Sequence, residues 1–242
     1  MNANEKSFLE QNLSRLRTRL LVMCASVGIA LDEACDALTS GNVGKACAVV
    51  DGDDAINGLE NEIDEMSLTL LVRNQPVAQD LRLVVAALRM VIDLERIGDE
   101  AASIAERAAM LHETLPEPVL DAVSALMRTA KTSYGRAVEA FRGLESEEAL
   151  ALCREDDEST QEEVRALQRI MDYFCLDAGR SISSPPGIPG SSYAGMHGIL
   201  ICRALNRICR RAANIAEHVY FIAEGVNIKH APPAPRQDAS RL

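Results

Sequence analysis

Two carboxylates four residues apart, Glu95 and Asp99, form the pattern with the clearest chemical potential in the sequence. On a helix, side chains at this spacing share one face and lie about 6 Å apart. Two carboxylates this close repel each other unless a cation lies between them, and oxygen donors of this kind suit a hard metal ion. The same spacing is common on solvated helix faces, so the pair alone indicates either a metal site or an ordinary exposed surface.

A second acidic segment could complete such a site. Residues 43–72 are expected to form the preceding helix. It contains several acids: Asp51, Asp53, Asp54 and Glu60. If the two helices pack side by side, Asp53 or Asp54 would add oxygen donors, so the candidate metal ligands are Glu95, Asp99, Asp53 and Asp54.

Helical periodicity extends over nearly the whole chain, in which Trp is absent and aromatic residues make up 3%. It predicts six long helices, at about 4–38, 43–72, 74–111, 116–143, 146–176 and 195–226. Asn74 is the expected N-cap of the third helix, with Pro76 in its first turn. Residues 179–195 are rich in Gly, Pro and Ser and are expected to form a loop, and residues 229–242 a disordered tail.

Two of these helices carry apolar stripes that alternate steps of four and three residues, the pattern of a helix packed lengthwise in a bundle. The stripe of the third helix is Leu83, Ala87, Met90, Leu94, Ile97, Ala101, Ile104 and Ala108. That of the sixth is Ala194, Gly198, Ile201, Leu205, Ile208, Ala212, Ile215, Val219 and Ile222.

The two stripes also reveal an internal repeat. A shift of 111 residues places 94–106 on 205–217 with eight of thirteen positions identical, Arg96 falling on Arg207. The sequence therefore predicts an all-α fold of two tandem three-helix bundles. The bundles are expected at residues 1–112 and 113–228, with the loop 179–195 as an insertion in the second.

Composition and missing motifs exclude several classes of function. The formal net charge of −11 argues against nucleic-acid binding, because nucleic-acid phosphates would be repelled. The sequence starts without a basic and apolar leader, charges interrupt every apolar run, and the seven Cys form no CxxC pair, so we expect a cytoplasmic protein without membrane insertion. No Gly-rich phosphate loop, nucleophile elbow, HExxH or ExxH motif occurs.

Residues 73–106, RNQPVAQDLRLVVAALRMVIDLERIGDEAASIAE, resemble the most characteristic segment of PhoU proteins. That segment contains Gln-Pro, a short spacer, Asp-Leu-Arg, then Asp-Leu-Glu-Arg-Ile-Gly-Asp and Ile-Ala-Glu, and each element is present here. The resemblance extends from the first helix to the region 220–225, and the length and the number of repeats agree.

The resemblance implies two symmetric three-helix bundles that bind iron or zinc clusters on acidic pairs, one set in each repeat. It also implies a cytoplasmic adaptor, often a homodimer, that negatively controls the phosphate-starvation response. Such proteins are thought to link the ATPase subunit of the phosphate ABC transporter, PstB, to the sensor histidine kinase PhoR. By position, Glu95 and Asp99 match the first metal pair.

The second repeat departs from this pattern, because Asn206 and Arg210 stand where the family usually has Glu and Asp. A guanidinium repels a cation, so we expect metal only in the first repeat. Arg210 could instead pair with acids of the fifth helix, among them Asp156, Asp157 and Glu163. Two alternatives remain: an anion site on the newly basic face, and a thiolate site at Cys202 and Cys209.

Three functions are compatible with these observations. A regulator of phosphate uptake follows from the resemblance. A metal-dependent enzyme would have to use Glu95 and Asp99, and no base or nucleophile is evident beside them. A scaffold that has lost metal binding would act through protein contacts alone. We expect the regulator, not an enzyme.

Overall fold

The computed structural model describes residues 3–111, 114–178 and 190–228. These residues contain seven α-helices and no strand. Side chains are described except at 3–6, 156–158, 175–178 and 190–192. The helices are α1 (Ala3–Ser40), α2 (Val43–Asn74), α3 (Ala78–Met110), α4 (Glu117–Gly143), α5 (Ser146–Arg154), α6 (Asp156–Ala178) and α7 (Gly190–Glu224).

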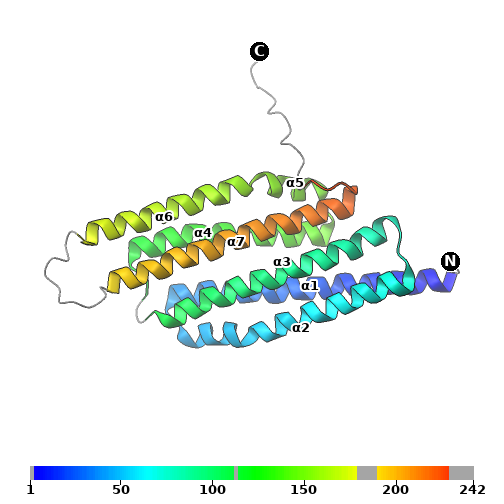
Figure 1. Ribbon diagram of the computed structural model, residues 1–242, viewed down its shortest axis with the longest axis horizontal. Helices are drawn as coiled ribbons and strands as arrows, with labels where there is room; N and C mark the ends of the chain where they lie inside the picture. Colours follow the sequence, from blue (N-terminus) through cyan, green and yellow to red (C-terminus); the bar gives the residue numbers. More distant parts are fainter. Residues whose placement is uncertain (1–2, 112–113, 179–189, 229–242) are drawn as a thin grey trace, which may run out of the picture.

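The helices form two bundles that lie side by side along one long direction (Figure 1). Helices α1, α2 and α3 pack together in the first bundle, and α4 to α7 in the second. The bundles meet where α3 packs against α7 and α1 against α4. The all-α fold of tandem three-helix bundles is confirmed, while the predicted boundary at 112–113 and the predicted tail 229–242 lie outside the described residues.

The apolar stripes lie where the two bundles form their core. Of the third helix's stripe, Leu83 is partly buried and every other member is buried. Of the sixth's, Ala194 is partly buried and the rest are buried. A step of three and four residues keeps these side chains on one side of each helix, so periodicity sufficed to locate the core.

The turn between α1 and α2 follows its sequence signals. Gly41 adopts a left-handed conformation (φ +67°), and the Asn42 amide donates to the Ala37 carbonyl 3.2 Å away, as in a Schellman ending. The Asn42 side chain then accepts a hydrogen bond from the Lys45 amide at 3.1 Å and caps α2. Both predicted helix ends are confirmed within two residues.

The predicted start of the third helix is wrong. Asn74 is the last residue of α2 rather than an N-cap, Pro76 lies in the connection, and α3 begins at Ala78 after Val77. A residue that precedes proline is disfavoured in the α conformation, and Gln75 ends α2 with a positive φ of 43°. Pro76 therefore acts as a helix stop here.

The predicted fifth helix is broken at Glu155, which separates α5 from α6. Consecutive acids at 155–158 repel one another inside a helix but are favourable at a helix N-terminus, where the macrodipole is positive. Arg136 of α4 holds the break by pairing with Glu148, at 2.5 Å, and with Glu155. Helix α7 begins at Gly190, so the predicted loop is wrong over 190–195, and 179–189 lie outside the described residues.

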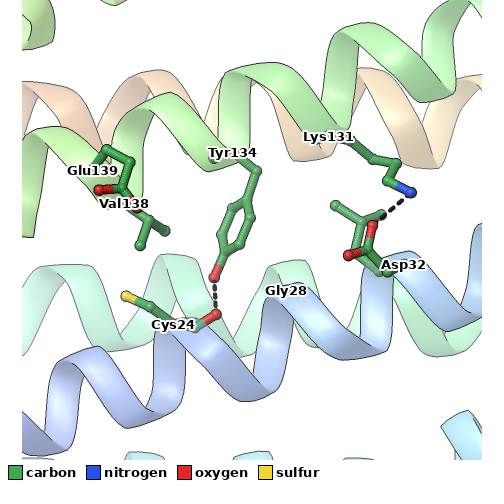
Figure 2. Close-up of a pocket in the computed structure, with 9 residues that line it drawn as sticks. Cys24, Gly28, Asp32, Lys131, Tyr134, Val138 and Glu139 are labelled. Atoms are coloured by element: carbon green, nitrogen blue, oxygen red, sulfur yellow. Dashed lines mark hydrogen bonds and ion pairs between the residues drawn. The ribbon is translucent and has the colours of Figure 1, made fainter.

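A buried tyrosine joins the two bundles on the α1–α4 side. Tyr134 points from α4 to α1, where its hydroxyl donates a hydrogen bond of 2.7 Å to the Cys24 carbonyl (Figure 2). Beside it, Lys131 pairs with Asp32 at 2.6 Å. The Tyr134 hydroxyl is the buried polar group of this contact, whereas the Lys131–Asp32 pair lies nearer the surface.

Replacing Tyr134 with Phe should lower the free energy of unfolding by about 0.5–1.5 kcal/mol, the usual net value of one buried hydrogen bond. Urea titration followed by circular dichroism measures this loss. Tyr220→Phe is the matched control, because this partly buried tyrosine has no hydroxyl hydrogen bond among the described residues. Equal stability of the two variants would contradict the assignment.

Candidate functional site

The site around Glu95 and Asp99 depends on a glycine between the two helices that form it. Gly98 is buried in α3, and a Cβ built on it would lie 3.1 Å from Ile56 Cδ1 and 3.6 Å from Asp53 Oδ1, both of α2. The missing side chain lets α2 approach closely. Asp53 is thereby brought beside the pair on α3, and its part in a metal site stays a prediction.

The charge of Asp99 raises the pKa of three neighbouring carboxyls, Asp53, Glu60 and Glu95. Burial raises the pKa of Glu95 first, and the charges of Asp99 and Glu60 add to it. Burial and the charge of Asp99 likewise raise the pKa of Asp53, against a lowering hydrogen bond from Asn57. The cluster carries more negative charge than its basic neighbours offset, so it favours any cation that reaches it.

We name five of these residues the acidic strip: Asp53, Glu60, Asp64, Glu95 and Asp99. Burial and the charges of Asp64 and Asp99 raise the pKa of Glu60, which places it between the two ends of the strip. One oxygen of Asp64, Oδ1, is buried and has no hydrogen-bond partner among the described residues. A buried carboxylate oxygen without a hydrogen-bond partner is uncommon in folded proteins.

The acidic strip fits a hard cation by donor chemistry, because carboxylate oxygens are what such ions bind. In the described part of the chain, no group of three or more His, Cys, Asp and Glu side chains is placed so that it could hold a metal ion. Asp54 is exposed, and its contribution is a charge that raises the pKa of Asp53.

The candidate ligands predicted from the sequence did not include Asp64. The signal was present, because residues 53, 57, 60 and 64 follow one another at steps of four, three and four, which is one face of a helix. Asn57, on the same face, donates to Asp53 Oδ2 at 3.3 Å. Counting the whole face rather than its first acids would have found the strip.

In the second repeat, an amide takes the place of the acid at the matching position. The Asn206 side chain donates from Nδ2 to Glu163 Oε2 at 2.5 Å and lies 3.4 Å from the Ser159 hydroxyl. Asn206 is buried, so α7 and α6 are joined here by neutral and charge-assisted hydrogen bonds. These contacts occupy the position at which a ligand carboxylate would stand.

The predicted ion pair between Arg210 and Glu163 is not formed, because Glu163 accepts from Asn206 instead. Arg210 is exposed, and the ion pairs between described side chains do not include it. The other proposed partners, Asp156 and Asp157, have side chains outside the described set. The thiolate alternative is also disfavoured, because burial and the charge of Glu163 raise the pKa of Cys202 to about 12.

A second polar cluster lies between the bundles, at the contact of α3 with α7. The buried Asp93 carboxylate receives Arg211 Nη1 and Asn214 Nδ2 on Oδ1, each at 3.2 Å. His218 Nε2 lies 3.6 Å from Oδ2. Burial raises the pKa of Asp93, but the His218 and Asn214 contacts and the Arg211 charge outweigh it, so the net pKa is lowered. Asp93 is thus a structural carboxylate that fixes one repeat against the other.

A hollow of about 220 Å³ lies at the other contact between the bundles, between α1 and α4 (Figure 2). Gly28 and Gly135 line it together with Tyr134 and the Lys131–Asp32 pair. Its cation is already neutralised by Asp32, so the hollow offers no uncompensated charge to a ligand. The acidic strip, by contrast, carries negative charge that its basic neighbours do not fully offset. It is therefore the candidate functional site.

Comparison with known proteins agrees with this geometry. The family described as PhoU domain matches residues 20–108 and again 123–219. The chain belongs to the PhoU family. The two matches fall on the two bundles, as a duplicated PhoU repeat requires, and the resemblance of the 73–106 segment is confirmed.

Relatives and solved structures of PhoU proteins cover nearly the whole chain. The Pseudomonas aeruginosa phosphate-specific transport system accessory protein PhoU homolog is 34% identical over 90% of this chain and 86% of its own length. The phosphate-specific transport system accessory protein PhoU of Escherichia coli K12 is 27% identical over 95% of this chain and 91% of its own length. The crystal structure of PhoU from P. aeruginosa superposes with a TM-score of 0.80 at 32% identity, covering 90% of this chain and 99% of that one.

A more distant structure shows the same PhoU fold. The phosphate transport system regulatory protein PhoU from Streptococcus pneumoniae gives a TM-score of 0.78 at 23% identity, over 90% of this chain and 98% of that one. The PhoU family consists of accessory and regulatory proteins, so the chain is not an enzyme. A separate finding concerns membranes: within the described residues, no helix is long and apolar enough to cross a bilayer.

Proposed function

We propose that this chain is a cytoplasmic regulator of phosphate uptake that negatively controls the phosphate-starvation response. The observation that carries this proposal is the PhoU match over both repeats, together with relatives described as accessory proteins of phosphate-specific transport. The proposed partners are a PstB-like ATPase of the phosphate ABC transporter and a PhoR-like sensor histidine kinase. The chain would link the two by contact, since an adaptor needs surfaces rather than a reaction centre.

The proposed cofactor is a divalent or ferric metal ion, iron or zinc, bound in the first repeat only. Glu95, Asp99 and Asp53 would hold it, with Asp54 at the edge. Such an ion would supply the positive charge that the strip lacks, as the raised pKa values of Glu95 and Asp53 indicate. The second repeat is unsuitable, because Asn206 is engaged with Glu163 and Arg210 adds a like charge.

Deleting the gene should raise expression of a phosphate-regulated reporter severalfold in phosphate-rich medium, because the restraint on the response is lost. Complementation with the native gene should restore low expression. The measurement is reporter activity in both strains at high and low phosphate, in a background checked for a second PhoU gene. Low reporter activity in the deletion strain at high phosphate would refute the proposed regulation.

A further inference from the structure

A hollow of about 260 Å³ lies between α1 and α2, at the end of the first bundle where α1 begins and α2 ends. The two helices run antiparallel and pack against each other (Figure 1). We call this hollow the arginine hollow, and its polar lining is mainly basic or neutral: Asn12, Arg15, Thr69, Arg73 and Asn74. It shares no residue with the acidic strip.

One ion pair fixes how the two helices face each other at the arginine hollow. Arg19 of α1 pairs with Glu62 of α2. In antiparallel helices, a step back along one helix is matched by a step forward along the other. Seven residues before Arg19 and seven after Glu62, Asn12 therefore lies opposite Thr69. These two side chains mark the centre of the hollow.

Two arginines stand on either side of this centre. Arg15 lies three residues beyond Asn12 on α1, and Arg73 lies four residues beyond Thr69 on α2. Their positions are thus about 10 Å apart along the helix axes, a gap that two arginine side chains can close on one bound group. Both are exposed, and in the described part of the chain neither side chain takes part in an ion pair or a hydrogen bond.

The arginine hollow has positive charge in excess. Two acids also line it, Glu62 and Glu65. Glu62 is held by Arg19, which leaves Glu65 as the acid that faces Arg15 and Arg73. The chain as a whole has a formal net charge of −11, so the hollow is a local centre of attraction for an anion on an acidic protein.

The remaining lining suits a flat ring. Leu70 is buried and Met66 is partly buried beneath the hollow, and Phe8 is 55% exposed at its edge. An exposed aromatic side chain is a stacking surface for a ring, and the Thr69 hydroxyl and Asn74 amide can bond to polar atoms on it. The volume of the hollow approaches that of small-molecule sites, about 300–1,000 Å³, and far exceeds what a single ion needs.

We propose that the arginine hollow binds a small phosphomonoester that carries a flat ring, the chemistry of a nucleoside monophosphate. Its phosphate lies between Arg15 and Arg73, and its ring lies against Phe8. A phosphomonoester carries about −1.5 to −2 charges at neutral pH, and guanidinium groups bind phosphate oxygens through paired hydrogen bonds. A carboxylate carries a single charge and would satisfy only one of the two arginines. The proposal rests neither on the proposed metal nor on phosphate regulation.

The test is isothermal titration of the full chain, in phosphate-free buffer, with AMP, GMP, CMP and UMP. At least one of the four should bind with a Kd below about 1 mM. The matching nucleoside, ribose 5-phosphate and inorganic phosphate each lack part of the ligand and should bind at least about tenfold more weakly. The proposal is overturned if none of the four nucleotides binds within this limit, or if the nucleoside or inorganic phosphate binds as well as the nucleotide.

Single substitutions locate the binding in the arginine hollow. Arg15→Gln and Arg73→Gln should each weaken binding at least about tenfold, because each removes charged hydrogen bonds to the phosphate. Phe8→Ala should weaken it about fivefold or more through loss of stacking. Glu65→Gln should strengthen it by about two- to fivefold, because a negative charge beside the phosphate is removed.

Arg128→Gln is the matched control, because this exposed arginine lies on α4, away from the hollow, and should leave the affinity unchanged. Glu5→Gln addresses an acid one helical turn before Phe8 whose side chain is outside the described set. It should change the affinity by less than about twofold. A gain of about tenfold or more would show that Glu5 already occupies Arg73, and would overturn the proposal.

Native affinity in the folded variants Arg15→Gln and Arg73→Gln would overturn it too, with far-ultraviolet circular dichroism as the check on folding. The reporter assay of phosphate regulation is independent of these titrations. Failure of one proposal is therefore distinguishable from failure of the other.

Discussion

Replacing Asp93 with Ala should lower the free energy of unfolding by about 3–5 kcal/mol, the largest loss expected from any single substitution considered for this chain. The carboxylate is buried between the bundles, where it receives Arg211 and Asn214 and lies beside His218. Its removal leaves a guanidinium, 20% exposed, without its counter-charge in the α3–α7 contact. Urea unfolding of the native protein and the variant measures the loss.

Asp32→Ala is the matched control for Asp93→Ala. Asp32 also joins the bundles, through Lys131, but its side chain is 60% exposed, so its removal should cost only about 0.2–1 kcal/mol. If both variants lost the same stability, Asp93 would have no special part in fixing the two repeats.

The contribution of Asp93 should also depend on pH. Its pKa is lowered in the fold, so the folded state favours the ionised carboxylate, and this stabilisation is fully present above the unfolded pKa of about 3.9. It is lost as the pH falls from there through the folded pKa. The difference in unfolding free energy between the native protein and Asp93→Asn should therefore shrink below about pH 4.

Replacing both Glu95 and Asp99 with Ala should abolish metal binding by the isolated protein. The two carboxylates supply most of the proposed oxygen donors, and the charge and number of ligands set the affinity of such sites. Isothermal titration of EDTA-treated protein with Zn²⁺ or Fe²⁺ measures the loss. The matched control is Glu117→Ala with Asp121→Ala, an exposed acidic pair with the same spacing on α4, which should leave binding unchanged.

The stability of the metal-free variant provides a second readout. Burial and like charges raise the pKa of Glu95, so the ionised carboxylate opposes folding at neutral pH when no cation is present. Without metal, Glu95→Ala with Asp99→Ala should unfold at an equal or higher urea concentration than the native protein. A clear loss of stability would show that these side chains are structural.

The fold followed from the sequence wherever one periodic signal dominated. The stripe from Ala87 to Ala108 placed α3 in the core, and the shift of 111 residues gave the two bundles. Local signals that compete were harder to interpret. Asn74 is a favourable N-cap, yet Pro76 restricts Gln75 and ends α2 first. The acids at 155–158 suited both a continuous helix and a new helix start, and the latter occurs.

The candidate site was predictable only in part, for a related reason. The spacing of Glu95 and Asp99 identifies a helix face, and Asp53 followed from the neighbouring acidic segment. The inter-repeat role of Asp93 was not predictable, because Arg211 and His218 are more than a hundred residues away and no periodicity links them to it. For the same reason, the sequence did not predict that Glu163 bonds to Asn206 rather than to Arg210. That contact depends on how α6 packs on α7.

We propose that the two PhoU repeats have diverged: the first binds a cation, whereas in the second Asn206 donates a hydrogen bond to Glu163 in place of metal binding. Metal stoichiometry tests it most directly, by titrating the EDTA-treated native protein and the variant Asn206→Glu with Arg210→Asp. We expect the native protein to bind metal, Glu95→Ala with Asp99→Ala to remove this binding entirely, and the Asn206→Glu, Arg210→Asp variant to bind additional metal. Equal occupancy of both repeats in the native protein, or native binding that survives the loss of Glu95 and Asp99, would contradict it.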